Sequence, residues 1–325
     1  MQRRYGSIDP ALEAVLAGLA DQGLVSPDPT AMPIAEARAG NVRYLMHLGA
    51  EAASVASIVS RDVPGPAGPV PVKIIRPEAA DIPAPALLYL HGGGFAFGDL
   101  ETHEGLAREL AARSGAVVVM PHYRRTPEHP FPAAYHDSLA TWHWLTTEAT
   151  CVALGLDRRR LAMAGDSAGG NLALALCAAL RDGAGTPPAA AALIYGMFSR
   201  RTDTHSHQTY AAGPGLTSAR LAWFWDRYLP GGVGEDDPRA VPWLVTLEGL
   251  PPLALFVAEC DILADDTWDL AERLEAVGAT FTLDAFPNLH HGAIQLSRLF
   301  PPASDALSKV AERIAERLGS RGMSA

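Results

Sequence analysis

Hydrophobic and polar positions follow two alternating patterns over most of the chain. Short, continuous apolar runs that end in glycine or polar residues predict strands buried on both faces of a sheet. Segments with apolar residues at helical spacing lie between them, and this alternation is typical of a mainly parallel α/β sheet. The predicted strands cover 54–60, 71–76, 86–90, 115–123, 159–165, 190–196, 252–261 and 279–287. The predicted helices cover 8–22, 35–46, 102–113, 133–148, 171–183, 267–277 and 303–318.

The stretch 199–246 interrupts this alternation. It is first polar and then aromatic, and it has no continuous apolar run of the kind that a buried strand needs. We interpret it as a mostly helical insertion between two strands. Its aromatic side chains either line a binding site or pack the insertion against the rest of the chain. These side chains are Tyr210, Trp223, Phe224, Trp225 and Tyr228.

Composition and charge narrow the class of protein. Of the 325 residues, 48% are hydrophobic and 19% are charged, which supplies a sizeable core and excludes disordered and coiled-coil chains. Asp and Glu number 36 against 26 Lys and Arg, a net charge of −10. An acidic chain lacks the positive electrostatic potential that attracts nucleic acids and anionic membranes. We therefore expect neither nucleic acid nor a membrane as a partner.

Cysteine usage predicts a cytoplasmic protein. The three cysteines, Cys151, Cys177 and Cys260, are far apart in the sequence and show no metal-ligand spacing. Their odd number and wide spacing fit free thiols in a reducing compartment better than a set of disulfide bonds. The start of the chain lacks the apolar region of a signal peptide, and the longest apolar runs fall short of the roughly 18 residues of a membrane-spanning helix.

Residues 165–169 read GDSAG, a GxSxG pattern. The pattern follows a predicted buried strand and opens a predicted helix, which is the context that a nucleophile elbow requires. Its glycines carry no Cβ to clash across the tight turn, and the helix N-terminus behind Ser167 favours developing negative charge. We therefore predict that Ser167 is a nucleophile. The alternative is a glycine-rich strand–helix turn with an ordinary serine.

Three successive glycines, Gly92, Gly93 and Gly94, follow the predicted strand 86–90. No side chain covers their N–H groups, which suits an oxyanion hole whose donors lie about 3 Å from the developing anion. A plain turn or a phosphate-binding loop is the alternative. The phosphate interpretation lacks both the Lys-Ser/Thr pair of a P-loop and the GxGxxG spacing.

A nucleophilic serine needs a histidine base, and four histidines follow it in the chain. They are His205, His207, His290 and His291. His205 and His207 lie in the insertion, where a polar loop is favoured over a metal-binding pair. His290 and His291 follow the strand 279–287, at the carboxyl edge where catalytic groups of α/β folds gather. We choose His291, which precedes a glycine, as the base.

The base in turn needs an orienting carboxylate. Glu259, Asp261, Asp265 and Asp266 all lie near the end of the strand 252–261. Asp261 falls on the first turn after the strand, which directs it to the same edge of the sheet. Asp265 and Asp266 begin the next helix, where acidic side chains suit the helix dipole.

These residues together resemble the hormone-sensitive lipase family of α/β-hydrolases, in its microbial esterase branch. The matching landmarks are HGGGF at 91–95, YRRTPEHPFPAA at 123–134, GDSAGGNLA at 165–173, Asp261 in DILADD and His291 before Gly292. The resemblance covers about residues 40–320 and is greatest for bacterial acetyl esterases. It implies the α/β-hydrolase fold, with a mostly parallel eight-stranded sheet flanked by helices and a helical cap. The implied segments are 1–50 (cap helices), 51–198 (first part of the core), 199–246 (cap insertion) and 247–325 (second part of the core).

The resemblance also implies roles for particular residues. Ser167 would be the nucleophile, His291 the general base and acid, and Asp261 its orienter. The implied oxyanion hole consists of the N–H groups of Gly93, Gly94 and Ala168, with Gly92 in the same loop and His91 supporting it. The implied acyl pocket includes Phe95, Tyr210, Trp223 and Phe224.

The sequence therefore predicts a carboxylesterase that hydrolyses short, acetyl-like esters. Its partner is a small-molecule ester, it needs no metal or organic cofactor, and the resemblance makes a homodimer an expectation. The same residues would also serve an N-acetyl or other amide hydrolase. A non-catalytic binding protein on a hydrolase scaffold and an interfacial lipase are the further alternatives. The chain departs from the family pattern at Arg125-Thr126, Ile262 and Ala293, and the departures at Ile262 and Ala293 bear on substrate size and orientation.

Overall fold

The computed structural model describes residues 3–49 and 51–320. The predicted segments 1–50 and 247–325 therefore extend into residues 1–2, 50 and 321–325, which lie outside the described part of the chain. Eight strands form one sheet in the order β1-β2-β4-β3-β5-β6-β7-β8. They are β1 (Ser57–Val63), β2 (Val70–Arg76), β3 (Ala84–Leu90), β4 (Val117–Pro121), β5 (Leu156–Asp166), β6 (Ala191–Ile194), β7 (Leu253–Cys260) and β8 (Phe281–His290).

The sheet is mostly parallel, as the alternating pattern predicts. Only β2 runs against its neighbours, pairing antiparallel with β1 and β4, and every other neighbouring pair is parallel. All residues of the inner strands β3 and β7 are buried, which explains their continuous apolar sequences. The edge strand β1 is exposed at every position but the last.

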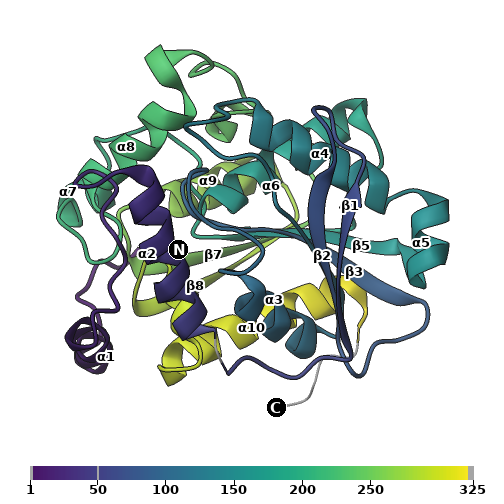
Figure 1. Cartoon of the computed structure of the whole chain (residues 1–325). Coiled ribbons are helices and arrows are strands. Elements are labelled where there is room, and N and C mark those ends of the chain that lie inside the picture. Colours follow the sequence, from purple (N-terminus) through teal and green to yellow (C-terminus); the bar gives the residue numbers. More distant parts are fainter. Residues whose placement is uncertain (1–2, 50, 321–325) are drawn as a thin grey trace.

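Helices cover both faces of the sheet (Figure 1). They are α1 (Pro10–Asp21), α2 (Ile34–Leu48), α3 (Glu104–Ser114), α4 (Ala133–Leu145), α5 (Glu148–Leu154), α6 (Ala168–Ala179), α7 (His205–Thr209), α8 (Ser218–Tyr228), α9 (Ala264–Ala276) and α10 (Pro301–Leu318). Short helical turns are η1 (Leu180–Ala184), η2 (Pro230–Gly232), η3 (Pro242–Leu244) and η4 (Ala293–Leu296). In Figure 1, α3 and α10 lie below the sheet, and α4, α6 and α9 lie above it.

Several element boundaries differ from the sequence prediction, among them those of α4, β1 and β8. The helix expected over 133–148 ends at Leu145, and Thr147 caps a separate helix α5 by accepting a hydrogen bond from the N–H of Thr150. Strand β1 begins three residues later than expected, at Ser57. Strand β8 continues to His290, which lies opposite Cys260 in the sheet register instead of in the following loop.

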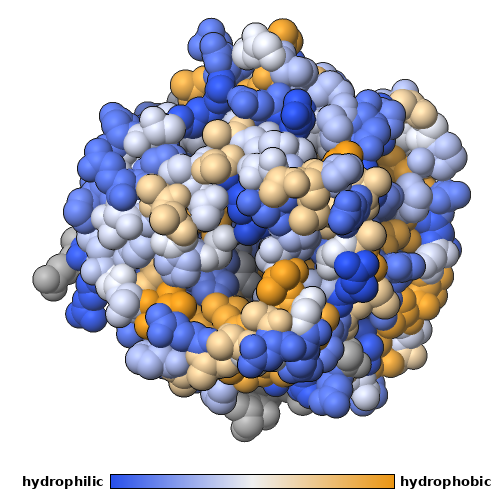
Figure 2. Space-filling view, turned by 60° about the vertical axis from the view of Figure 1, so that its left-hand side comes forward, coloured by the Kyte–Doolittle hydropathy of each residue, from blue (hydrophilic) through white to orange (hydrophobic). Residues whose placement is uncertain are grey.

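The insertion and the N-terminal helices lie together on one side of the molecule. In Figure 1, α1, α2, α7 and α8 all lie on the left. The insertion is helical, with α7 and α8 joined by irregular chain, and contains no strand among its residues, all of which are described. Figure 2 shows this side of the molecule, with a hollow in its surface and hydrophobic side chains gathered beside and below it.

Candidate active site

Ser167 lies in a sharp turn between β5 and α6. Its φ of 54° is in the left-handed region that non-glycine residues rarely adopt. The turn closes because residues 165 and 169 are glycines: a Cβ on Gly165 would lie 2.2 Å from the Gly169 carbonyl oxygen, and one on Gly169 would lie 1.8 Å from the Leu90 carbonyl oxygen. The strand–turn–helix context expected for GDSAG is therefore present, and the turn raises Ser167 at the carboxyl end of the sheet.

The structure brings Ser167, His291 and Asp261 together. Nε2 of His291 lies 2.8 Å from Oγ of Ser167, and Nδ1 of His291 lies 2.6 Å from Oδ2 of Asp261. An ionised carboxylate only accepts, so Nδ1 carries the ring proton and Nε2 is left to accept the hydroxyl proton of the serine. Asp261 is fully buried and also accepts from the N–H of Leu263 at 2.9 Å. The geometry suits proton transfer from a serine that attacks a carbonyl.

The other three carboxylates and the two histidines of the insertion lie elsewhere. Asp265 and Asp266 begin α9, as expected, and bind other parts of the chain. Burial raises the pKa of the Glu259 carboxyl, and that side chain does not join the serine–histidine pair. His205 and His207 lie on the short helix α7, where a polar loop had been expected. His205 meets Tyr5 edge to face, and Nε2 of His207 lies 2.9 Å from Oγ of Ser218.

The glycine loop after β3 lies beside Ser167. Gly93 and Gly94 have φ values of 112° and 58°, and both line the same cavity as the serine. In the part of the chain that the structure describes, no hydrogen-bond acceptor engages the N–H groups of Gly93, Gly94 or Ala168. The N–H of Gly92 differs, because it donates to Oδ1 of Asp166 at 2.8 Å. Gly92 therefore belongs to the glycine loop, as expected, but its N–H is already engaged and does not add to the three implied donors.

The buried side chain of His91 contacts the backbone of the glycine loop. Its Nδ1 lies 2.9 Å from the Gly92 carbonyl oxygen, and its ring stacks on Tyr123 with centroids 4.2 Å apart. The Tyr123 hydroxyl donates to the His91 carbonyl oxygen at 2.7 Å. Burial lowers the pKa of His91 well below its ordinary value, so the ring remains neutral.

A cavity of about 290 Å³ opens at Ser167 and His291. Its walls come from the sheet edge, from the N-terminal helices and from the insertion. The apolar part of the wall consists of Leu16, Leu24, Val25, Leu45, Leu48, Phe97, Met197, Leu216, Phe224 and Leu296. The polar part consists of Ser26, Asn41, Tyr44, His103, Asp166, Arg220, His290 and Gln295. A small molecule fits this space, with its reacting group next to the serine.

Of the aromatic side chains predicted for the pocket, only Phe224 lines the cavity. Phe95 is buried against Tyr228, with their rings stacked 3.6 Å apart. Tyr210 is buried, and its hydroxyl donates to the Gly6 carbonyl oxygen at 2.9 Å. Trp223 stacks on Phe97 at 6.4 Å on the neighbouring face of α8. Phe95, Tyr210 and Trp223, which were predicted as pocket residues, do not line the cavity. Trp225 and Tyr228 also lie outside it.

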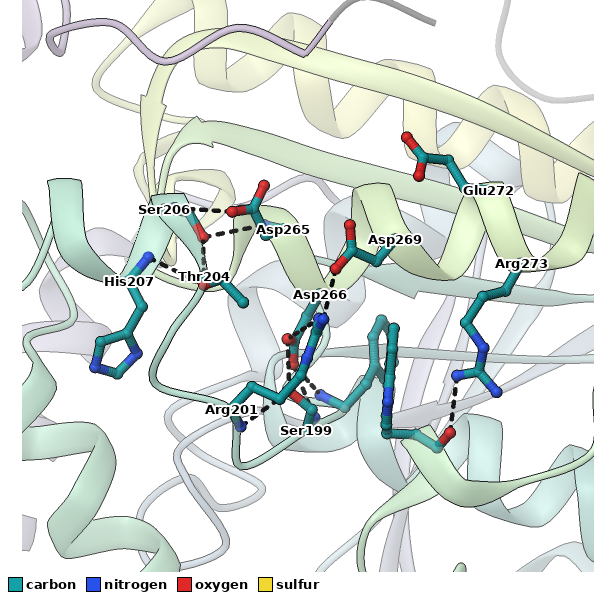
Figure 3. Close-up of polar contacts among 12 residues, drawn as sticks. Ser199, Arg201, Thr204, Ser206, His207, Asp265, Asp266, Asp269, Glu272 and Arg273 are labelled. Atoms are coloured by element: carbon teal, nitrogen blue, oxygen red, sulfur yellow. Dashed lines mark hydrogen bonds and ion pairs between the residues drawn. The ribbon is translucent and has the colours of Figure 1, made fainter.

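Acidic residues of α9 anchor the start of the insertion (Figure 3). The N–H groups of Phe198 and Ser199 donate to Oδ2 of Asp266, and the Ser199 hydroxyl donates to Oδ1 at 2.7 Å. Asp265 accepts from the N–H of Ser206 at 2.8 Å. Arg201 reaches the carboxylates of α9 as well. The helix that follows Asp261 therefore also holds the chain that leads into the insertion.

The fold and the grouping of these side chains define an α/β-hydrolase. The sequence profile of the α/β-hydrolase fold matches residues 87–295. The ethyl acetate hydrolase of Pseudomonas putida is 35% identical over 255 residues, which cover 77% of this chain and 79% of that protein. An acetyl-hydrolase of Streptomyces hygroscopicus is 39% identical over 219 residues, covering 67% and 70%.

Solved structures of esterases are similar to this chain as well. An ester hydrolase from the Lake Arreo metagenome superposes with a TM-score of 0.89 at 33% identity, covering 96% of this chain and all of the other. The esterase of the archaeon Pyrobaculum calidifontis gives a TM-score of 0.87 at 31% identity, covering 96% and 99%. The chain belongs to the α/β-hydrolase fold family, in its hormone-sensitive-lipase-like branch. It is a carboxylic ester hydrolase.

Among the residues that the structure describes, no helix has both the length and the apolar character needed to cross a bilayer.

Proposed function

We propose that this chain hydrolyses short-acyl esters through a Ser167–His291–Asp261 triad. The observation that carries the proposal is the continuous pair of contacts, 2.8 Å from Ser167 to His291 and 2.6 Å from His291 to Asp261. Each contact is within the reach needed for proton transfer or for orientation of the imidazole.

In the proposed reaction, His291 takes the hydroxyl proton of Ser167 while Oγ attacks the ester carbonyl. The tetrahedral oxyanion accepts hydrogen bonds from the N–H groups of Gly93, Gly94 and Ala168. His291 then returns the proton to the leaving alcohol, and an acyl-enzyme remains. Water attacks this acyl-enzyme with the same imidazole as base, which releases the acid and restores the serine.

The modest cavity supports a preference for a short acyl chain. Phe224 lies against Gly94, because a Cβ on that glycine would lie 2.3 Å from the phenyl ring. The ring therefore limits the space next to the proposed oxyanion donors. We further propose that the segments 1–50 and 199–246 together form the cap over this cavity, since both supply wall residues such as Tyr44 and Leu216.

The test uses wild type and Ser167→Ala with p-nitrophenyl esters from C2 to C16 and with an N-acetylated amide. We expect hydrolysis to be fastest at C2 to C6, slow for the amide and absent in the variant, whose circular dichroism spectrum matches that of wild type. A fluorophosphonate should label wild type at Ser167. Activity retained by Ser167→Ala would exclude the proposed nucleophile, and a preference for C12 or longer esters would exclude the short-acyl assignment.

A further inference from the structure

The wall of the cavity contains a guanidinium without a carboxylate partner. Nη1 of Arg220 donates to the Gly215 carbonyl oxygen at 3.0 Å, and Nη2 donates to Oγ of Ser26 at 3.0 Å. Nε is buried and has no hydrogen-bond partner within the described ranges 3–49 and 51–320. Over the same ranges, no acidic side chain forms an ion pair with Arg220, whereas Arg201 and Arg313 each pair with two carboxylates.

The positive charge of Arg220 has the Asp28 carboxylate as an acidic neighbour, but the two side chains form no ion pair. Burial lowers the pKa of its guanidinium, and the Asp28 carboxylate opposes that shift, so the group stays protonated as arginines in proteins do. Asp28 itself accepts hydrogen bonds from the N–H and the hydroxyl of Thr30, at 3.0 and 2.8 Å. Arg220 is half-buried, and a charge with limited access to water and no ion partner is unfavourable, so an anion that enters the cavity would reduce that cost.

Arg220 shares the cavity with the reacting groups. It lies one helical turn before Phe224 on α8, so both side chains project from the same face of that helix. Phe224 packs on Gly94 of the proposed oxyanion loop. Asn41 and Tyr44, from α2, line the same space as Arg220. Ser167 and the Arg220 guanidinium therefore line the walls of one cavity.

We propose that Arg220 is a specificity-determining residue that selects esters carrying a carboxylate in their acid or alcohol part. This inference rests on the function proposed above. A planar guanidinium matches a carboxylate with two parallel N–H groups, and each terminal nitrogen of Arg220 has a second N–H beyond the one that it donates to Gly215 or Ser26. Arg220 is the only Lys or Arg side chain in the described cavity wall, which suits a singly charged group better than a phosphate dianion.

The experiment measures kcat/KM for two matched substrate pairs. Mono-p-nitrophenyl glutarate and its methyl ester differ by a carboxylate in the acid part, and O-acetyllactate and its methyl ester differ by a carboxylate in the alcohol part. In at least one pair, we expect wild type to favour the carboxylate substrate by about tenfold or more, as a charge-assisted hydrogen bond provides. The pair that shows the preference identifies the part of the ester that Arg220 recognises. Ratios near one for both pairs would overturn the proposal.

Variants separate recognition from a structural role. We expect Arg220→Met to reduce the carboxylate preference to about one, and Arg220→Lys to retain part of it. The matched control is Arg159→Met, which removes the same charge at a side chain that is 91% exposed and outside the cavity, and its ratio should equal that of wild type. If Arg220 only held Gly215 and Ser26 in place, Arg220→Met would slow both substrates equally and leave the ratio unchanged.

A binding measurement keeps this inference separate from the proposed function. Calorimetry with Ser167→Ala, which is not expected to turn over its ligand, compares O-acetyllactate with its methyl ester. Tighter binding of the carboxylate ligand, weakened by added salt and lost in Ser167→Ala/Arg220→Met, supports the subsite even if wild type hydrolyses neither substrate. Equal binding within this pair and also within the glutarate pair would overturn the subsite. Failure of wild type to hydrolyse p-nitrophenyl acetate would count against the proposed function alone.

Discussion

The N–H of Gly92 donates to the carboxylate of Asp166, the residue before the candidate nucleophile, at 2.8 Å. The same Oδ1 accepts from the Tyr89 hydroxyl at 2.6 Å. The ends of β3 and β5 are joined through this carboxylate, so the glycine loop and the serine turn are held at a set separation. Asp166 is thus a positioning residue for the proposed oxyanion hole.

Replacement of Asp166 by Ala should lower kcat for p-nitrophenyl acetate by about tenfold or more, with a smaller change in KM. The reason is that the Gly92 and Tyr89 donors lose their acceptor and the loop is no longer held against Ser167. Unpaired buried donors cost about 1–3 kcal/mol, so the free energy of unfolding should fall as well. Asp166→Asn keeps an acceptor oxygen and should lose less activity. An unchanged kcat in Asp166→Ala would contradict the positioning role.

Asp261→Asn should lower kcat by about 10³-fold or more, because an amide no longer holds the His291 proton on Nδ1. Steady-state kinetics with p-nitrophenyl acetate measure the loss. Glu259→Gln is the matched control: this carboxyl is also buried at the end of β7, yet it does not contact His291. Its kcat should remain within a few-fold of wild type. Equal losses in the two variants would mean that Asp261 acts only through stability.

Gly169→Ala should destabilise the fold by about 3 kcal/mol or more, because the new Cβ would lie 1.8 Å from the Leu90 carbonyl oxygen. Gly18→Ala provides the control, since it lies within α1 and nothing lies within 4 Å of its added Cβ. That exposed helical position should gain about 0.5–1 kcal/mol. Urea unfolding followed by circular dichroism gives both values. Comparable values for the two variants would show that the serine turn tolerates a side chain.

Acid should weaken the fold through its buried histidines. Burial lowers the pKa values of His91, His103 and His290. The unfolded chain therefore binds more protons than the folded chain below about pH 6.5, and stability falls as pH decreases through that range. For His103, which is only 3% exposed, the loss between pH 7.5 and 5.5 should be about 1 kcal/mol.

Urea unfolding of wild type and His103→Gln at the two pH values tests this expectation. The variant should lose less stability on acidification, because it lacks one of the groups that the unfolded state protonates. The same pH dependence in both proteins would show that His103 does not contribute.

Much of the fold follows from the sequence because burial on both faces leaves a continuous apolar run. The strands β3 and β7 are examples, since every one of their residues is buried. The turn at Ser167 is equally local: only glycine fits at positions 165 and 169. The boundary between α4 and α5 was missed because it depends on one threonine cap within an otherwise helical pattern.

The direction in which a helix face points is decided by tertiary packing. The sequence alone does not distinguish the aromatic side chains of α8 from one another. In the structure, Phe224 lines the cavity, whereas Trp225 and Tyr228 pack against Phe95. Adjacent positions on a helix differ by about 100° around its axis, and the side chain that faces the cavity depends on how the helix rests on the glycine loop.

By itself, the sequence determined the order of strands and helices, the serine turn, and the choice of Ser167, Asp261 and His291 as residues at one edge of the sheet. Only the tertiary structure decided that Gly92 is bound to Asp166, which side chains line the cavity, and that Arg220 lies there without a carboxylate. The physical reason is the sequence separation of the residues that interact. Strand and turn preferences depend on residues that are neighbours in the sequence, whereas hydrogen-bond partners and cavity walls come from segments far apart in the chain.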